Sequence, residues 1–279
     1  MKQNPFSVYD FLGYFIPGAL FLYSFYIIRY FKNCDIINFE KLFNTIDEPN
    51  LEIGILFLIT SYVLGHLLSF ISSISVEQYS IWRYGYPSKY LLNFSIEKYW
   101  NFKGSFLKGF WRIIMILFIF PIAFLDYFLG NWFGFKAFYH KNIDNNLAKI
   151  IKIKINLLAK KIGITSKNGF ENGSGKNADF FRIVLHYTYE NSINHQSKFN
   201  NYVALYGFTR TISLLLNLLF WYFLQHVILY SSFDKIKILI LLIIAAMSYV
   251  FFMAFMKFYR RYTLEGFMVL AITDLNDNK

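Results

Sequence analysis

The stretch Tyr202-Val-Ala-Leu-Tyr-Gly-Phe-Thr-Arg210 joins a long lysine-rich segment to an apolar run of membrane length. The lysine-rich segment covers residues 136–208, and the apolar run that follows it covers Thr211–Tyr230. No run of glycine, serine or proline separates the two. A basic module joined directly to a membrane helix can move that helix when an anion binds to the module.

Composition places the chain among membrane proteins. Its 279 residues are 56% hydrophobic and 22% aromatic, and only 16% are charged. This is too apolar for an ordinary soluble domain, and several apolar runs approach the roughly 20 residues that cross a bilayer. The sequence therefore predicts an all-α, multi-pass helical membrane protein with a basic helical cytoplasmic module.

Four apolar runs are expected to cross the bilayer: Phe11–Ile28, Ile53–Ile74, Thr211–Tyr230 and Ile236–Met256. Small and polar residues in the second run favour close packing against another helix or self-association. Arg210 stands at the mouth of the third run, where its side chain is expected to extend toward water.

The net charge of +11 is concentrated between these runs. Basic loops favour the cytoplasmic side, so we expect the acidic loop at residues 31–52 to lie outside and both termini inside. The apolar run near 113–135 is interrupted by Pro121 and Asp126. If it crossed the membrane, the lysine-rich segment would face outward. We therefore expect a broken, re-entrant or interfacial element, with five spans as the alternative.

The predicted organisation has four parts. These are two spans with the acidic outer loop (1–76), a basic cytoplasmic or interfacial module (77–208) that includes the element near 113–135, two further spans (209–256), and a cytoplasmic tail (257–279).

Within the basic module, residues 147–162 show apolar positions at helical spacing, with most of the lysines off the apolar stripe. Such a helix could lie on anionic lipid, pack in a cytoplasmic bundle or line an anion site. Further on, Arg182 and His186 share a helix face and resemble the Arg/His motif of HEPN ribonucleases, but with a shorter spacer. The candidate phosphate contacts are Lys149, Lys152, Lys160, Lys161, Arg182 and His186.

The residue pattern does not indicate an enzyme. Cys34 is the single cysteine, the five histidines form no metal-binding pair, and the acids are scattered. We therefore expect no metal, no cofactor and no catalytic residue.

The segments Tyr9-Asp-Phe-Leu-Gly-Tyr-Phe-Ile-Pro-Gly-Ala19 and Phe199-Asn-Asn-Tyr-Val-Ala-Leu-Tyr-Gly-Phe-Thr-Arg210, with the basic middle between them, resemble small bacterial anti-phage membrane effectors. Among these the layout is most similar to the transmembrane effectors of the Hailong system. The resemblance implies a homotetrameric channel in the bacterial inner membrane. It also implies that single-stranded DNA oligomers, made by a partner nucleotidyltransferase, hold the channel closed, and that its opening depolarises the cell.

The first hypothesis is accordingly an oligomeric channel whose pore is controlled by a nucleotide or oligonucleotide on the basic module. A membrane scaffold for a cytoplasmic partner and a small-solute transporter are the alternatives, and both lack a nucleic-acid ligand.

Overall fold

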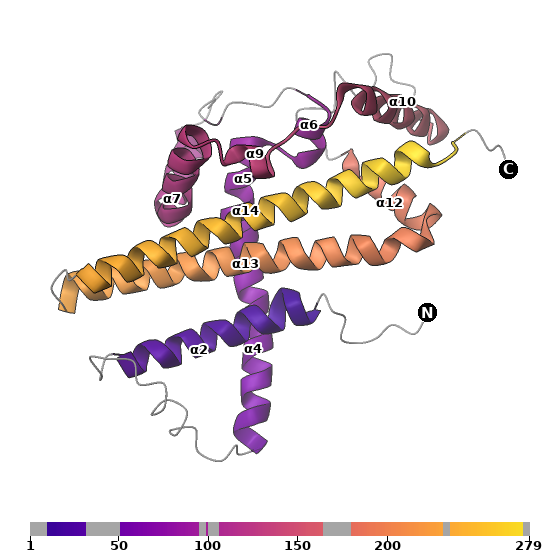
Figure 1. Cartoon of the computed structure of the whole chain (residues 1–279). Coiled ribbons are helices and arrows are strands. Elements are labelled where there is room, and N and C mark those ends of the chain that lie inside the picture. Colours follow the sequence, from indigo (N-terminus) through magenta and orange to yellow (C-terminus); the bar gives the residue numbers. More distant parts are fainter. Residues whose placement is uncertain are drawn as a thin grey trace.

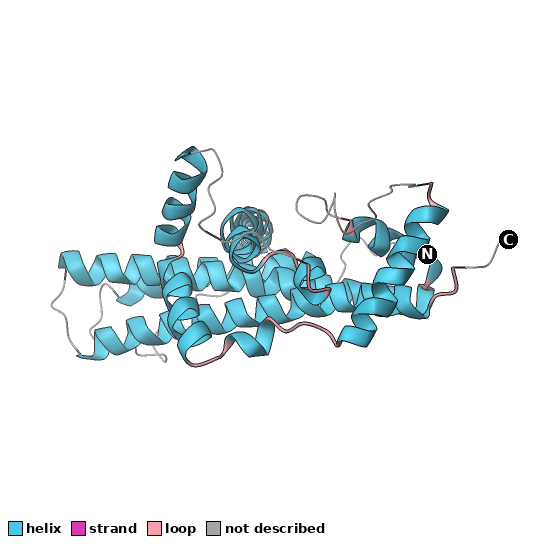
Figure 2. Ribbon diagram, turned by 90° about the horizontal axis from the view of Figure 1, so that it is seen from above, coloured by secondary structure: helices cyan, strands magenta, loops and turns pink. Residues whose placement is uncertain are grey.

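The computed structural model describes residues 10–31, 51–94, 99, 106–163, 180–230 and 235–275, and all regular elements among them are helical (Figures 1 and 2). The α-helices are α2 (Ile16–Phe31), α4 (Leu51–Ser72), α5 (Gln78–Tyr84), α6 (Pro87–Leu91), α7 (Phe106–Phe118), α8 (Phe120–Leu125), α9 (Lys136–Tyr139), α10 (Asn145–Lys161), α12 (Phe181–Asn191), α13 (Ile193–Tyr230) and α14 (Lys235–Ile272). Three π-helical segments adjoin them: η1 (Phe11–Phe15), η2 (Ser73–Glu77) and η3 (Asp126–Trp132). The all-α prediction is confirmed for the described residues.

The longest elements, α13 and α14, form an antiparallel pair that runs through the whole molecule (Figure 1). Ser213 Oγ donates to the carbonyl of Ser248 at 2.9 Å, and Ser248 Oγ donates to the carbonyl of Ser213 at 3.1 Å. Both serines are fully buried. Small side chains that bond across the contact allow two helices to approach closely.

A second axis crosses this pair. Helices α4, η2 and α5 follow one another in a rod that passes across α13 and α14, and Figure 2 shows this rod end-on. The rod ends at Gly85, whose φ of +74° suits glycine, and Pro87 then begins α6.

The N-terminal helix packs on α4 through two glycines. A Cβ atom at Gly18 would lie 1.8 Å from the carbonyl oxygen of Ser61, and one at Gly65 would lie 1.8 Å from the carbonyl oxygen of Tyr14. The backbones of the two helices therefore touch. Ser61 and Gly65 of the second apolar run therefore serve a contact within the chain.

Three helical stretches are long and apolar enough to cross a bilayer: Leu51–Leu91, Ile193–Leu229 and Lys235–Ile272. They contain three of the four predicted spans. The remaining one, Phe11–Ile28, lies in η1 and α2, whose described apolar part, Phe11–Ser24, is shorter. The predicted acidic loop lies almost wholly outside the described residues.

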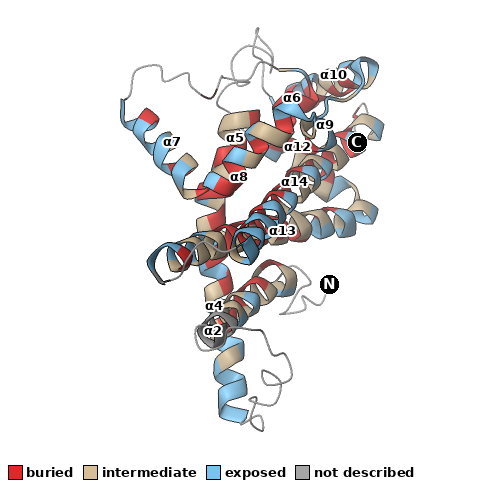
Figure 3. Ribbon diagram, turned by 60° about the vertical axis from the view of Figure 1, so that its left-hand side comes forward, coloured by how far each residue is buried: buried red, intermediate tan, exposed pale blue. Residues whose placement is uncertain are grey.

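The apolar run near 113–135 is broken, and its re-entrant or interfacial placement stays a prediction. Phe106–Phe118 and Phe120–Trp132 are apolar helices that bend by 92° at Ile119, which has φ −101° and ψ 30°. Pro121 follows in the first turn of α8, where it lacks an N–H to continue the ladder from α7. The geometry is that of a broken span or a re-entrant loop. Helix α7 projects from the body, and much of its apolar surface is uncovered (Figure 3).

The basic helix α10 is part of a helical bundle. Asp144 caps it by accepting from the backbone N–H of Asn146 at 2.8 Å. Its apolar face packs into a core with α6, α12 and the end of α14, whose buried members include Ile151, Ile155, Leu158, Phe181, Phe267 and Leu270. The apolar face of α10 is thus packed in a bundle, and a role of its basic face toward lipid or an anion stays a prediction.

One predicted helix boundary was wrong. The residue pattern predicts a single helix over residues 179–230, but Ser192, with φ −140° and ψ 74°, separates α12 from α13. The predicted fourth span ends at Met256, and α14, which contains it, continues as a helix to Ile272. The helix continues because Phe267 is buried in the core beneath α10 and α12, and this burial stabilises the additional helical turns.

Candidate functional site

A cavity of about 890 Å³ opens where the α4–η2–α5 rod passes α12, α13 and α14. Its walls carry seven aromatic side chains together with aliphatic and polar ones. The lining residues are Ser73, Ile74, Glu77, Gln78, Ile81, Trp82, Tyr86, Trp111, Phe181, Arg182, Leu185, His186, Tyr206, Tyr259 and Tyr262. A mostly apolar hollow with a few polar groups is the usual form of a small-molecule site.

Two of the six predicted site residues meet in this cavity. Arg182 and His186 both lie on the exposed side of α12, one helical turn apart, and both line the wall. His186 makes no hydrogen bond within the described part of the chain, so its ring nitrogens are available to a ligand. Phe181 beside them is buried against Gly266 and orients α12 on α14.

The four predicted lysines lie on α10 and do not line the cavity. Lys152 Nζ stands 4.7 Å from the ring centre of Phe94, and Lys161 Nζ stands 5.9 Å from that of Tyr187 on α12. Lys149 and Lys160 are exposed. The predicted group therefore divides into an arginine–histidine pair in the cavity and a basic surface on α10.

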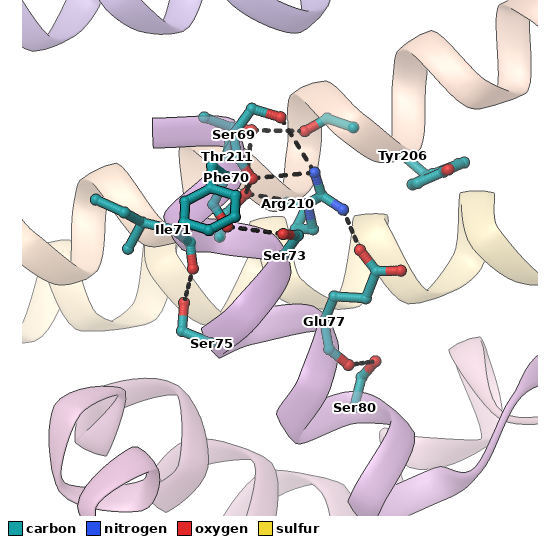
Figure 4. A network of polar contacts seen from close by, with 12 residues as sticks. Ser69, Phe70, Ile71, Ser73, Ser75, Glu77, Ser80, Tyr206, Arg210 and Thr211 are labelled. Atoms are coloured by element: carbon teal, nitrogen blue, oxygen red, sulfur yellow. Dashed lines mark hydrogen bonds and ion pairs between the residues drawn. The ribbon is translucent and has the colours of Figure 1, made fainter. Parts of the chain in front are cut away.

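An ion pair stands at the wall of the cavity, which its acidic member Glu77 lines (Figure 4). Its partner Arg210, on α13, is buried and donates through Nη1 to Glu77 Oε2. Its Nε donates to Ser72 Oγ at 3.0 Å, and its Nη2 reaches the hydroxyl of Ser69 at 3.2 Å. The expectation that Arg210 extends to water was wrong, because α4 and η2 supply acceptors at the point where they cross α13.

The sequence contained a weak signal for this pair. Glu77 and Arg210 carry opposite charges, and each stands at the end of an apolar run. Pairing them required knowledge that the two runs cross. The π-helical turn η2 is a further local irregularity that places Glu77, and such turns are frequent at functional sites.

A second buried charge was also missed. Asp126, in η3, is fully buried and accepts hydrogen bonds from the hydroxyls of Tyr79 at 2.9 Å, Tyr84 at 2.7 Å and Tyr139 at 2.5 Å. The nearest cation is Arg83, whose Nε is 3.8 Å from the carboxylate. Burial, and then the charge of Asp126, raise the pKa of the Tyr139 hydroxyl, which therefore remains a donor. This cluster fastens the broken element to α5 and α9.

His140 follows that cluster and lies between two tyrosine rings. Its ring centre is 4.2 Å from that of Tyr90 and 5.1 Å from that of Tyr84. Burial, and then the charge of Lys136, lower the pKa of His140 to about 4. His140 is therefore a neutral packing residue at pH 7.

Among the described residues, no three His, Cys, Asp or Glu side chains are grouped so that they could hold a metal ion. Comparisons of the chain with protein families, with curated proteins and with solved structures find no match.

Proposed function

We propose that the chain is an oligomeric, channel-forming membrane effector of bacterial anti-phage defence, controlled by a nucleotide or single-stranded DNA oligomer. The observation that carries the proposal is the aromatic cavity with Arg182 and His186 on its wall. The layout-level resemblance to Hailong effectors supports the defence role, the tetrameric state and a nucleotidyltransferase partner.

The cavity suits a phosphate ester that bears a planar ring. Tyrosine and tryptophan faces stack on nucleobases, a contact that contributes about 1–3 kcal/mol per base. Arginine and histidine donate to phosphate oxygens. A volume of about 890 Å³ falls within the range of ligand pockets, which is roughly 300–1,000 Å³. The basic surface of α10 would receive the following phosphates of a longer strand.

The position of the cavity suits control of the membrane helices. Its walls belong to η2 and α5, which continue α4, and to α13 and α14. A ligand that contacts these helices more closely in one arrangement than in another shifts the population toward that arrangement. With the basic module on the cytoplasmic side, an intracellular ligand would reach the cavity directly.

Binding can be tested on the protein purified in mild detergent. Trp82 and Trp111 line the cavity, so an oligonucleotide that stacks there should change the intrinsic fluorescence. The double substitution R182Q/H186Q should weaken binding about 10-fold or more, because two phosphate donors are lost. The matched control is R261Q, which removes an exposed arginine of α14 that does not line the cavity.

A second variant separates the two predicted groups. This variant replaces Lys149, Lys152, Lys160 and Lys161 with glutamine. It should weaken the binding of a long strand more than the binding of a mononucleotide, and it should reduce the salt dependence of strand binding. Failure of any nucleotide or oligonucleotide to bind the unmodified protein would refute the proposal in favour of a scaffold or transporter. Liposomes with the protein should also leak ions, and an oligonucleotide should alter the leak.

A further inference from the structure

We propose that the Glu77 carboxylate reads the base of the ligand and selects bases that carry an exocyclic amino group, namely cytosine, adenine and guanine, over thymine and uracil. This inference rests on the proposed function, because it assigns the ligand class of the same cavity.

Glu77 has the geometry of a fixed acceptor. Among the described residues that line the cavity, it carries the one carboxylate. Its Oε2 is held by Arg210, whereas no hydrogen bond within the described part of the chain reaches Oε1. The side chain is 20% exposed and lines the cavity, so the carboxylate can meet a ligand there without being freely solvated.

The carboxylate is also restrained in direction. Ser72 Oγ accepts from Nε of Arg210 at 3.0 Å, and Ser69 Oγ accepts from its Nη2 at 3.2 Å (Ser69 in Figure 4). With the carbonyl of Ser69, three polar contacts from α4 therefore fix the cation that holds Glu77. A preorganised acceptor discriminates between ligands more strongly than a mobile one, since it cannot turn away from an unsuitable partner.

Hydrogen-bond chemistry then determines the preferred base. A carboxylate is acceptor-only, and an exocyclic amino group offers it an N–H donor, as in the acidic-residue contact to cytosine N4. In the same register thymine and uracil present a carbonyl oxygen to Glu77 and an N3–H where cytosine has its N3 acceptor, so the contact to Glu77 lacks a donor. The rejection of such a ligand is larger than the loss of one hydrogen bond, because a partly buried acceptor is left unpaired beside a second acceptor.

Gln78 supports this role. It follows Glu77 in sequence, lines the same cavity, and its side-chain amide makes no hydrogen bond within the described residues. Its amide can donate to a ring nitrogen or carbonyl of a base whose amino group contacts Glu77. The aromatic walls supply stacking that is indifferent to base identity, so the two polar side chains carry the discrimination.

The test compares oligo-dC with oligo-dU of equal length, whose bases differ in the amino or carbonyl group at position 4 and in N3, which is an acceptor in cytosine and an N–H donor in uracil. Fluorescence anisotropy with the full-length protein in detergent should give a dissociation constant about 10-fold lower for oligo-dC. In E77Q the glutamine amide can donate to the uracil carbonyl, so the ratio should fall to about 3-fold or less. R182Q serves as the control, since loss of a phosphate donor should weaken both strands alike and preserve the ratio.

E77Q also removes the ionic partner of Arg210 and can disturb the fold. Q78L leaves that ion pair in place, and it should reduce the preference for oligo-dC over oligo-dU in part. Equal binding of oligo-dC and oligo-dU to the unmodified protein would overturn the inference and leave the proposed function intact. Binding of neither strand would instead overturn the proposed function. Displacement of oligo-dC by nanodiscs rich in phosphatidylethanolamine, whose ammonium can also meet Glu77, would assign the cavity to a lipid headgroup.

Discussion

Replacing Gly65 with alanine should separate α2 from α4 and destabilise the fold. The added Cβ would lie 1.8 Å from the carbonyl oxygen of Tyr14 and 2.9 Å from its Cα atom. Both atoms belong to the backbone, so no side-chain rotation can relieve the contact. Ordinary carbon contacts lie at about 3.5–4.0 Å, and the two helices must therefore move apart by roughly 2 Å.

The cost follows from that displacement. Overpacking of a rigid contact costs about 1–3 kcal/mol, and sometimes more, whereas alanine gains about 1 kcal/mol over glycine from helix propensity. Gly54 provides the matched control on the same helix, because a Cβ there meets nothing within 4 Å. We expect G65A to lose up to about 2 kcal/mol and G54A to gain up to about 1 kcal/mol.

Thermal unfolding in detergent, followed by tryptophan fluorescence, measures this difference. At about 2–4 °C per kcal/mol, the midpoints of G65A and G54A should lie several degrees apart, with G65A the lower. Size-exclusion chromatography of the same samples reports the oligomeric state. Equal midpoints for the two variants, or a changed oligomer with unchanged stability, would show that Gly65 faces another subunit instead of α2.

Three further perturbations address the buried charges. R210M should lower the free energy of unfolding by about 3 kcal/mol, because it leaves Glu77 without its cation. The double variant R210M/E77Q should recover at least about 1 kcal/mol of that loss. Losses that add up in the double variant would contradict a direct pair. D126N should lower the free energy of unfolding by about 2–4 kcal/mol, because three tyrosine donors lose a charged acceptor. Loss of the Asp144 helix cap, the control, should lower it by about 1 kcal/mol. A lower thermal midpoint for the Asp144 variant than for D126N would refute the role of the Asp126 cluster. The pKa of His140 falls from 6.5 to about 4 on folding, so the unfolded chain takes up a proton at a higher pH than the folded chain does. The free energy of unfolding should therefore decline as the pH drops from 6.5 toward 4, by about 1–2 kcal/mol for this half-buried ring. H140Q should flatten that part of the pH profile of the unfolding midpoint, and an unchanged slope would exclude His140 as its source.

The sequence predicted the elements of this fold better than their arrangement. Apolar runs of about 20 residues identify α4, α13 and α14 because helix length and hydropathy are local properties. Pro121 predicted the break between α7 and α8 for the same reason. Helical spacing also predicted α10, with its ends within two residues of those observed.

The helix ends were less predictable where packing overrides local preference. Lys257 and the two arginines after it predict the end of the fourth membrane span, and this span boundary stays a prediction. The helix itself continues, because Phe267 and Leu270 have a core to enter. That core is formed by α10 and α12, which are distant in sequence, so its burial energy leaves no mark on the local pattern.

The candidate site was predictable only in part. The i, i+4 spacing of Arg182 and His186 placed them on one face, which is the face that lines the cavity. The Glu77–Arg210 pair joins residues 133 positions apart, and the Asp126 cluster draws tyrosines from two other elements. Long-range polar contacts of this kind depend on how the helices cross, which hydropathy does not encode.

The crossing itself constrains how the molecule can meet a bilayer. Helix α4 passes across α13 and α14 (Figure 1), so in this arrangement the three candidate spans cannot all follow one membrane normal. The outer half of α4 nevertheless exposes apolar side chains such as Leu56 and Val63, and that of α14 exposes Leu239 and Leu242. Each of these surfaces requires lipid or another subunit to cover it. The rod is held at the crossing by Arg210, and under the proposed function the ligand binds against the same Glu77 that holds Arg210. A ligand at that point acts on a polar contact that joins the rod to α13 at the crossing, and so on the angle between the two sets of spans.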